Sequence, residues 1–381
     1  MRVVVRRWIV ACAGIVLVGL GIPSDAYAQR PEPIERELVL LATIPKRMSE
    51  AAISAFKAYA KERYGVTITI NDLTMGTPVA YGRIVEWKGR PQADIFWGGE
   101  SSLYDDLATQ GLMAPLQVPG PVWQRVPASV GKPKPILLKD PNRFWVGSGA
   151  QVYGLVYNER VYERLGAAPP KEWDDLFNPK LRGWIAQCAP TRSSSSHALY
   201  EIFLQDLGLE KGWAWLERLA AHTGFFTARS RDVPSLVARG EFAAGFAVPS
   251  IGALDERLLG HPIQFVFSKN SYVAPEAWGV LAGAPHPRAA QAFIEFMLSD
   301  AGQRALTGIG LYSVVPGLPL QGAPGSVEEK AVEFMGGIRS IFDIDVRNVY
   351  DDKIARARYQ EVNQEFHRRI ESNLDALKKK Y

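Results

Sequence analysis

The sequence has few of the residues from which catalytic and metal centres are commonly built. It contains 2 cysteines and 5 histidines in 381 residues. The histidines lack the spacing of metal ligands: they are His197, His222, His261, His286 and His367. The sequence also has no nucleophile elbow, zinc-protease motif, phosphate-binding loop or dinucleotide fingerprint. These absences argue against the common classes of hydrolase, metalloprotease, nucleotide-dependent enzyme and dehydrogenase. We therefore expect no catalytic residues, no cofactor and no metal.

The chain also has no strong excess of one charge and only one long apolar run. Three arginines in the first seven residues precede an apolar run over residues 8–22, and small residues at 26–28 offer a cleavage site. Because the run is shorter than the ~20 residues of a membrane span, we predict a signal peptide over residues 1–28. Export into a bacterial periplasm follows.

Removal of this segment changes the charge and the cysteine content. The net charge falls from +4 to +2, since three arginines and Asp25 are lost. So small an excess does not indicate a nucleic-acid partner. Cys188 is then the only cysteine, so the exported chain has no internal disulfide.

The stretch over residues 93–107 has the pattern of a ligand-binding edge. Residues 95–97 form a short apolar run, typical of a buried strand in a parallel sheet. Gly98 and Gly99 then allow a sharp turn, and Ser101 or Ser102 caps a helix. Open α/β sheets bind ligands at this edge, and a helix N-terminus favours anions. An ordinary strand-to-helix connection is the alternative interpretation.

Strand and helix patterns alternate along the chain, which predicts parallel sheets covered by helices. The predicted strands are residues 38–43, 66–70, 95–97, 143–146, 152–158, 184–188, 243–248, 263–267 and 278–281. The predicted helices are residues 49–64, 77–86, 193–207, 213–222, 233–239 and 287–297, with a mostly helical tail over 326–381.

A second candidate site is the hydroxyl-rich junction over residues 191–196. Its hydroxyls and free backbone N–H groups can satisfy several oxygens of a phosphate or carboxylate. A helix cap with solvent-facing serines is the alternative.

Other candidate contacts lie outside these two stretches or at their strand ends. Arg229 and Ser230 precede a later helix, and Trp97 is an aromatic residue at the end of a strand. Tyr272 and Glu276 lie where the chain returns to its first half.

Several segments in order resemble the extracellular solute-binding proteins of ABC importers. They are residues 93–97 with the following helix, 173–185, 237–245, 275–280, and 284–287 with the helix up to 303. The subgroup is the one usually labelled iron(III)-type, which also holds binders of phosphonates, thiamine and sugar phosphates. The resemblance covers most of residues 38–316.

The resemblance implies an α/β, two-lobed periplasmic-binding-protein fold of type II. Each lobe would hold a helix-covered, mostly parallel sheet, and crossing hinge strands would join the lobes, which close on a ligand. We expect the first lobe over residues 29–148 and 272–315 and the second over 149–271. Residues 316–381 would form a helical segment packed on the second lobe.

The ligand contacts expected from the residues and the resemblance together lie on both lobes. They are Trp97, Gly99, Glu100, Ser101, Ser102, Thr191, Ser193, Ser194, Ser195, Arg229, Ser230, Ser250, Tyr272 and Glu276. The resulting hypothesis is a monomeric periplasmic protein that captures a small oxyanion-bearing solute for an ABC permease. Three alternatives stay open: a ferric or other metal binder, a ligand sensor for a membrane kinase, and a Ser/His hydrolase using His197.

The first prediction concerns iron. Ferric members of the resembled subgroup carry adjacent tyrosines where this chain has Ser250 and Ile251. Ferric ion prefers anionic oxygen ligands, which serine and isoleucine cannot supply. We expect Fe(III) to produce no phenolate charge-transfer colour in visible spectroscopy. A purple-red protein with stoichiometric iron would overturn the ligand argument.

Overall fold

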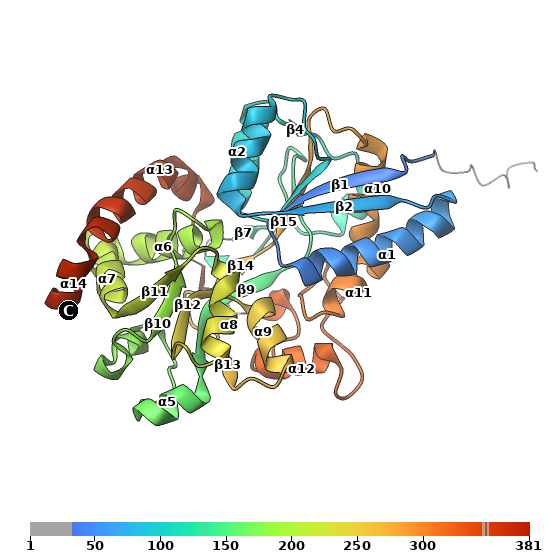
Figure 1. Ribbon diagram of the computed structural model, residues 1–381. Coiled ribbons are helices and arrows are strands. Elements are labelled where there is room, and N and C mark those ends of the chain that lie inside the picture. Colours follow the sequence, from blue (N-terminus) through green and yellow to red (C-terminus); the bar gives the residue numbers. More distant parts are fainter. Residues whose placement is uncertain (1–32, 134, 345–346, 349) are drawn as a thin grey trace, which may run out of the picture. The chain divides into compact units, whose positions relative to one another are not determined.

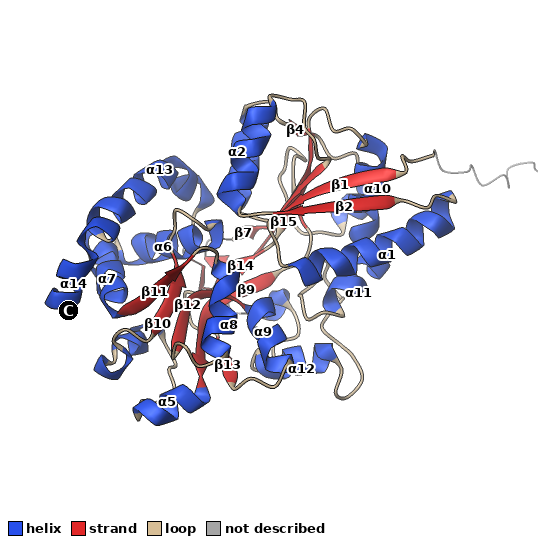
Figure 2. Ribbon diagram, viewed as in Figure 1, coloured by secondary structure: helices blue, strands red, loops and turns tan. Residues whose placement is uncertain are grey.

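The computed structural model describes residues 33–133, 135–344, 347–348 and 350–381 (Figure 1). The predicted signal peptide lies outside these residues. Among the helices that are described, none has both the length and the apolar character needed to cross a membrane. Two six-stranded sheets organise the chain, and helices flank the strands of each (Figure 2).

The first sheet has the order β2-β1-β3-β15-β4, with β8 also paired to β15. Strand β1 pairs in parallel with β2 and β3, whereas β15 is antiparallel to its neighbours. The strands are β1 Glu37–Ala42, β2 Thr69–Thr74, β3 Ile95–Trp97, β4 Met113–Ala114, β8 Val146–Gly147 and β15 Ala277–Leu281. The helices of this lobe are α1 Lys46–Tyr64, α2 Thr77–Trp87, α3 Ser101–Thr109, α4 Gly120–Gln124, α10 Pro287–Met297 and α11 Asp300–Thr307.

The second sheet has the order β11-β10-β12-β9-β13, with β14 also paired to β9. Strand β10 is parallel to β11 and β12, and β9 is antiparallel to β12, β13 and β14. The strands are β9 Gln151–Asn158, β10 Ile185–Cys188, β11 Thr223–Thr227, β12 Ala244–Pro249, β13 Ile263–Val266 and β14 Tyr272–Ala274. The helices are α5 Glu159–Leu165, α6 Ser194–Leu207, α7 Leu209–His222, α8 Val233–Ala238 and α9 Ser250–Leu258, with the short 3₁₀ turns η1 Trp173–Phe177, η2 Pro179–Leu181 and η3 Ser230–Asp232.

The chain crosses between the sheets at two adjacent places, from β8 to β9 and from β14 to β15. The side chain of Gln303 holds the chain next to the first crossing in place. Its Nε2 donates a hydrogen bond to the Ser148 carbonyl oxygen at 2.7 Å, and its Oε1 accepts one from the Val314 N–H at 3.0 Å. The predicted two-lobed α/β fold with crossing hinge strands is confirmed. The sheets are mixed rather than mostly parallel as predicted, because β15 and β9 pair in antiparallel fashion with all their neighbours. These antiparallel strands are those that follow the crossings.

Two predicted strands were misplaced. The strand expected over residues 66–70 is β2, Thr69–Thr74, because its register with β1 begins where Glu37 faces Thr69. Val66 and Ile68 are buried before the strand starts, so they pack into the core rather than pair. The strand expected over 143–146 is reduced to β8, because Arg143 has φ +67° and the chain turns there.

The C-terminal part adds helices outside both sheets. These helices are α12 Val327–Phe334, η4 Ile341–Asp343, α13 Asp352–Arg369, η5 Glu371–Asn373 and α14 Leu374–Lys380. Separately, four short strands form two small two-stranded sheets: β5 Ser129–Val130 pairs with β7 Ile136–Leu137, and β6 Lys132–Pro133 pairs with β16 Arg347–Asn348. Helix α12 contacts α9, and α14 packs along α7. Helix α13 contacts both α6 of the second lobe and α3 of the first. The exact lobe boundaries stay a prediction.

A matched pair of glycine substitutions tests the packing of the crossing strand β15. A Cβ at Gly279 would lie 2.5 Å from the Phe144 carbonyl oxygen, whereas a Cβ at Gly82 in α2 meets nothing within 4 Å. We expect Gly279→Ala to destabilise the fold by about 2 kcal/mol through overpacking. Gly82→Ala should stabilise it by about 0.5–1 kcal/mol. Urea denaturation measures both, and equal stability of Gly279→Ala and wild type would contradict this packing.

Candidate functional site

Three serine hydroxyls meet where α6 and η3 begin. The Oγ atom of Ser193 lies 2.9 Å from that of Ser195 and 3.1 Å from that of Ser230, and the Ser195–Ser230 distance is 3.2 Å. We call these three residues the serine triangle. Ser193 caps α6 by accepting a hydrogen bond from the Ser196 N–H at 3.4 Å. Since α6 and η3 follow the parallel strands β10 and β11, the triangle stands at the carboxyl edge of the second sheet.

A small cavity of about 40 Å³ lies against the triangle, and its walls come from both lobes. A buried water needs roughly 10–15 Å³, so the cavity holds about as much as a single oxyanion group. The first lobe contributes Thr43 and Pro45 after β1, and Gly76 and Thr77 at the start of α2. The second lobe contributes Tyr153, Arg192, Ser193, Arg229, Ser230, Arg231 and Pro249.

The small cavity has a positive wall of three arginines. Arg231 donates from Nη1 to the carbonyl oxygens of Thr43 and Ile44, both at 3.4 Å, and thereby reaches across to the first lobe. Burial, with a contribution from the nearby Arg229, lowers the pKa of Arg231, because burial disfavours its charged form more than the attraction of Asp232 favours it. Arg229 is paired with Asp232 at 2.9 Å. The wall therefore favours a negatively charged group.

The two lobes touch beside this cavity through Ser194 and Thr77, whose hydroxyl oxygens are 3.3 Å apart. Gly99 lies at the same contact. A Cβ built on it would be 2.7 Å from the Thr77 methyl group and 3.7 Å from the Ser194 hydroxyl, and its φ is +90°. Gly99 therefore serves the close approach of the lobes, as its place in the predicted turn suggested.

A buried carboxyl–imidazole pair joins the lobes a little further along. Glu100 Oε1 lies 3.4 Å from His197 Nδ1, and the two side chains are 2% and 0% exposed. The His197 ring packs against Tyr359 of α13 at a centroid distance of 4.3 Å. Burial raises the pKa of Glu100, and the attraction of His197 only partly opposes this effect. Within the described chain, Glu100 Oε2 and His197 Nε2 have no hydrogen-bond partner.

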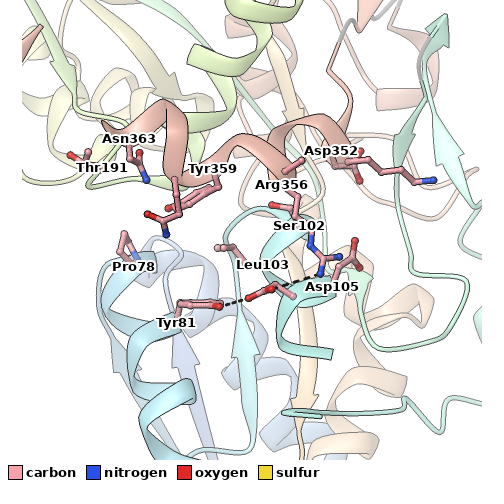
Figure 3. Close-up of a pocket in the computed structure, with 14 residues that line it drawn as sticks. Pro78, Tyr81, Ser102, Leu103, Asp105, Thr191, Asp352, Arg356, Tyr359 and Asn363 are labelled. Carbon is pink, nitrogen blue, oxygen red and sulfur yellow. Dashed lines mark hydrogen bonds and ion pairs between the residues drawn. The ribbon is translucent and has the colours of Figure 1, made fainter. Parts of the chain in front are cut away.

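A larger cavity of about 830 Å³ is lined by residues of α13, α2 and α3 (Figure 3). Ser102 and Thr191 line it, so the structure does not bring these two predicted contacts to the serine triangle. Ser101 interacts with Asp352 at the start of α13. Arg356 of α13 forms an ion pair with Asp106 of α3 at 3.7 Å, which Figure 3 shows as a dashed line. Ser101 and Ser102 thus face the C-terminal helix.

Three further predicted contacts lie in the core. Trp97 is 0% exposed, packs on Trp278 and Phe293, and donates from Nε1 to Ser148 Oγ at 2.9 Å. The Ser250 hydroxyl accepts from the Val152 N–H at 3.2 Å. Tyr272 is buried with its ring between Tyr153 and Tyr350. The three predicted side chains do not line the small cavity.

Glu276 lies in the crossing between β14 and β15, and it is also buried. Its Oε1 accepts from Gln151 Nε2 at 2.6 Å and from the Tyr153 hydroxyl at 3.1 Å. Burial raises the pKa of Glu276 to about 7, although both hydrogen bonds act to lower it. Its φ of +42° is rare for a residue with a side chain, and such backbone costs of order 1 kcal/mol or more.

Eight of the eleven residues that line the small cavity were not in the predicted contact set, and five of the eight have polar side chains. Thr43 follows β1 and Thr77 follows β2, so both lie where a strand leads into a helix, as Gly98 does. Thr77 was not recognised as such because β2 was predicted to end at residue 70. Arg192 and Arg231 adjoin predicted residues, so a wider window would have included them. Tyr153 gave no signal, because inside an apolar strand it cannot be told from a core tyrosine.

No group of three or more potential metal-ligating side chains is found in the described part of the chain.

Comparisons with known proteins identify the family of the chain. Residues 90–336 match the profile of a family described as "Bacterial extracellular solute-binding protein". The chain is 32% identical over 167 residues to the Phosphoglycerate transport regulatory protein PgtC of Salmonella typhimurium, an alignment that spans 43% of this chain and only 41% of PgtC. It is 22% identical over 305 residues to Iron uptake protein A2 of Synechocystis, covering 74% of this chain and 84% of that protein.

Solved structures share the fold. The periplasmic binding protein AfuA from Actinobacillus pleuropneumoniae, with fructose-6-phosphate bound, superimposes with a TM-score of 0.72 at 19% identity over 88% of this chain and 99% of AfuA. A ferric binding protein from Campylobacter jejuni gives a TM-score of 0.64 at 19% identity, over 85% of this chain and 99% of its own.

Substitution of Glu100 by glutamine tests the buried pair. Because burial raises the pKa of Glu100 above its ordinary value, the folded state holds this proton more tightly than the unfolded state. The stability that this proton provides is present at low pH and is lost as the pH rises through the raised pKa. We expect the melting temperature of wild type to fall relative to that of Glu100→Gln as the pH is raised from 4.5, the ordinary pKa of a glutamate. Parallel melting curves above this pH would contradict a buried, protonatable Glu100.

Proposed function

The chain belongs to the bacterial extracellular solute-binding proteins, and from this premise we propose that it captures a small solute bearing a phosphate or another oxyanion. In this proposal the two lobes close around the solute and deliver it to an ABC permease in the inner membrane. The protein works in the periplasm as a monomer, after removal of residues 1–28. Closure and release, without chemical change of the solute, are its function.

The observation that carries the proposal is the serine triangle beside an arginine-rich wall. The triangle brings three hydroxyl groups within 3.2 Å of one another, two of them at the N-terminus of α6 and the third at the start of η3. An oxyanion takes several such donors at once, and the positive end of a helix of 14 residues favours its charge. Arg231 and Arg192 add positive charge at the rim of the cavity.

The same cavity supports an anion better than a ferric ion. Its arginines would repel a metal cation, and its remaining polar groups are hydroxyls and one phenol. Ser250 and Ile251, where ferric relatives carry tyrosines, lie at the start of α9, and both are buried. The ferric alternative therefore lacks the anionic oxygen ligands that it requires.

The relatives support a phosphorylated solute. PgtC is named for phosphoglycerate transport, and AfuA holds a sugar phosphate. A phosphate ester presents three terminal oxygens, which matches the three hydroxyls of the triangle. We therefore infer a phosphorylated metabolite of small size as the solute class, with phosphonates and dicarboxylates as the next to test.

A sensing role is the second candidate, because PgtC is named a regulatory protein. In that role the closed form would be presented to a membrane kinase rather than to a permease. The two roles differ in a cell that lacks the gene. Loss of uptake of the labelled solute indicates transport, whereas loss of induced expression of a separate transporter indicates sensing.

Removal of single hydroxyls from the triangle tests the proposal. The ligand panel consists of 3-phosphoglycerate, fructose 6-phosphate, inorganic phosphate, methylphosphonate, sulfate and succinate. At least one compound should raise the melting temperature, since a ligand at a hundredfold excess over its Kd stabilises the fold by about 2.7 kcal/mol. Ser195→Ala and Ser230→Ala should each weaken binding of the best compound about tenfold or more in calorimetry, because a hydrogen bond to a charged group contributes roughly 1.5–3 kcal/mol.

Two controls accompany these variants. Ser54→Ala removes an exposed hydroxyl from α1 and should leave affinity unchanged. Ser102→Ala, facing the larger cavity, should also have little effect, although the sequence pattern predicted a contact there. If both triangle variants bind as tightly as wild type, the anion site lies elsewhere.

A further inference from the structure

A chain of hydrogen bonds leads from the serine triangle to the lobe crossing. Ser195 interacts with the Tyr153 oxygen, and the Tyr153 hydroxyl lies 3.1 Å from Glu276 Oε1. Gln151 braces the inner end, since its Nε2 donates to both Glu276 Oε1 and the Tyr153 oxygen, at 2.6 and 3.2 Å. Glu276 does not line the small cavity. Tyr153 lines the cavity, whereas Ser195 adjoins it through its contacts with the lining residues Ser193 and Ser230. Glu276 can therefore act on a ligand only through Tyr153 and the serine triangle.

The protonation state of Glu276 determines which group donates and which accepts in each of these hydrogen bonds. An ionised carboxylate can only accept, so the Tyr153 hydroxyl donates to it and the Tyr153 oxygen accepts from Ser195. The hydroxyl hydrogen of Ser195 is then used in the hydrogen bond to Tyr153 and is not available to a ligand in the cavity. A protonated Glu276 instead donates from Oε1 to the Tyr153 oxygen, and the Tyr153 hydroxyl donates to the Ser195 oxygen. The Ser195 hydroxyl is then free to donate its hydrogen bond to a ligand. An oxyanion needs that hydrogen bond, because its oxygens are acceptors only.

We propose that Glu276 is a positioning residue that takes up a proton when the oxyanion binds, and so turns the hydroxyl of Ser195 toward the ligand. The inference rests on the proposed anion-binding function and adds proton coupling to it. The proton comes from solvent, ends on Glu276 Oε1, and returns to solvent when the anion leaves. Affinity for an oxyanion then falls as the pH rises above neutrality.

The surroundings of Glu276 allow this change of charge. The groups that face it are Gln151 and Tyr153 from β9, Tyr272 from β14 and Tyr104 from α3. Glu276 forms no ion pair among the residues that the structure describes. Beyond its neighbours, Glu100 acts on Tyr272 and Arg231 on Tyr153. With no fixed cation beside it, the carboxyl titrates near neutral pH, as its pKa of about 7 indicates.

A bound anion shifts this titration in the direction of proton uptake. A second negative charge nearby disfavours ionisation of a carboxyl group and raises the pKa of Glu276 further. At pH 6 Glu276 is already mostly protonated, so binding of the anion is accompanied by the uptake of much less than one proton. At pH 8 it is mostly ionised when free, so binding takes up close to one proton. The dissociation constant should rise roughly fivefold between pH 7 and pH 8.

The experiment measures proton uptake by calorimetry of wild-type protein in two buffers of different ionisation enthalpy, at pH 6 and pH 8. The probes are 3-phosphoglycerate, fructose 6-phosphate and sulfate. A phosphate ester loses its last proton near pH 6, so its own titration produces proton release at low pH and not uptake at pH 8. Sulfate keeps its charge over the whole range.

Two variants identify the group that takes up the proton. Glu276→Gln is permanently neutral and its amide can donate to Tyr153, so it should bind at pH 8 about as tightly as wild type does at pH 6, without proton uptake. Tyr153→Phe breaks the chain and should weaken binding and remove its pH dependence together. Glu159→Gln removes an exposed carboxylate elsewhere in the second lobe and should retain the wild-type coupling. Melting curves verify that each variant is folded.

The outcomes separate this inference from the function on which it rests. Binding of a probe with proton uptake at pH 8 that Glu276→Gln abolishes supports it. Binding without uptake at pH 8, or uptake that persists in Glu276→Gln, overturns the inference and leaves the anion site standing. Failure of every probe to bind at any pH from 5.5 to 8.5 overturns the proposed function, and the proton coupling with it.

Discussion

Parallel pairing of β10 with β11 is the constraint on which the site depends. Parallel strands end at the same edge, so the segments that follow them begin side by side there. Here those segments are α6 and η3, which bring Ser193 and Ser195 within hydrogen-bond distance of Ser230, which lies 37 and 35 residues further along the chain, respectively. The first sheet repeats the arrangement with Thr43 and Thr77. The cavity is thus bounded by the ends of strands from both lobes.

This edge also explains why so many polar groups are buried between the lobes. Hydroxyls, carboxyls and an imidazole that would be exposed in separate lobes become enclosed where the lobes meet, as Ser194 with Thr77 and Glu100 with His197 illustrate. Buried polar groups are costly unless they are paired. In the function that we propose, closure would favour a ligand that supplies missing partners and disfavour one that leaves them unmatched. Specificity and lobe closure would then have the same physical origin.

The crossing strands connect the cavity with the hinge. Tyr153 belongs to β9, which starts directly after one crossing, and Glu276 lies in the other. Their hydrogen bond therefore links two segments of chain that any relative motion of the lobes must involve. The positive φ of Glu276 places its carboxyl against β9 at the cost of backbone strain. A ligand held at the serine triangle, as we propose, would in this way be coupled to the geometry of the hinge.

The sequence by itself determined the fold class and the hydroxyl-rich junction of α6, because alternating strand and helix patterns, glycine turns and serine caps are local signals. The sequence accordingly singled out Ser193, Ser195 and Ser230, which the structure brings together, while their contact with a ligand stays a prediction. Only the tertiary structure decided that Trp97 and Ser250 belong to the core, that Ser102 faces α13, and that Thr43, Thr77 and Arg231 complete the cavity. These outcomes depend on the register of β2 and on how the two lobes meet, which are set by contacts between residues far apart in the chain.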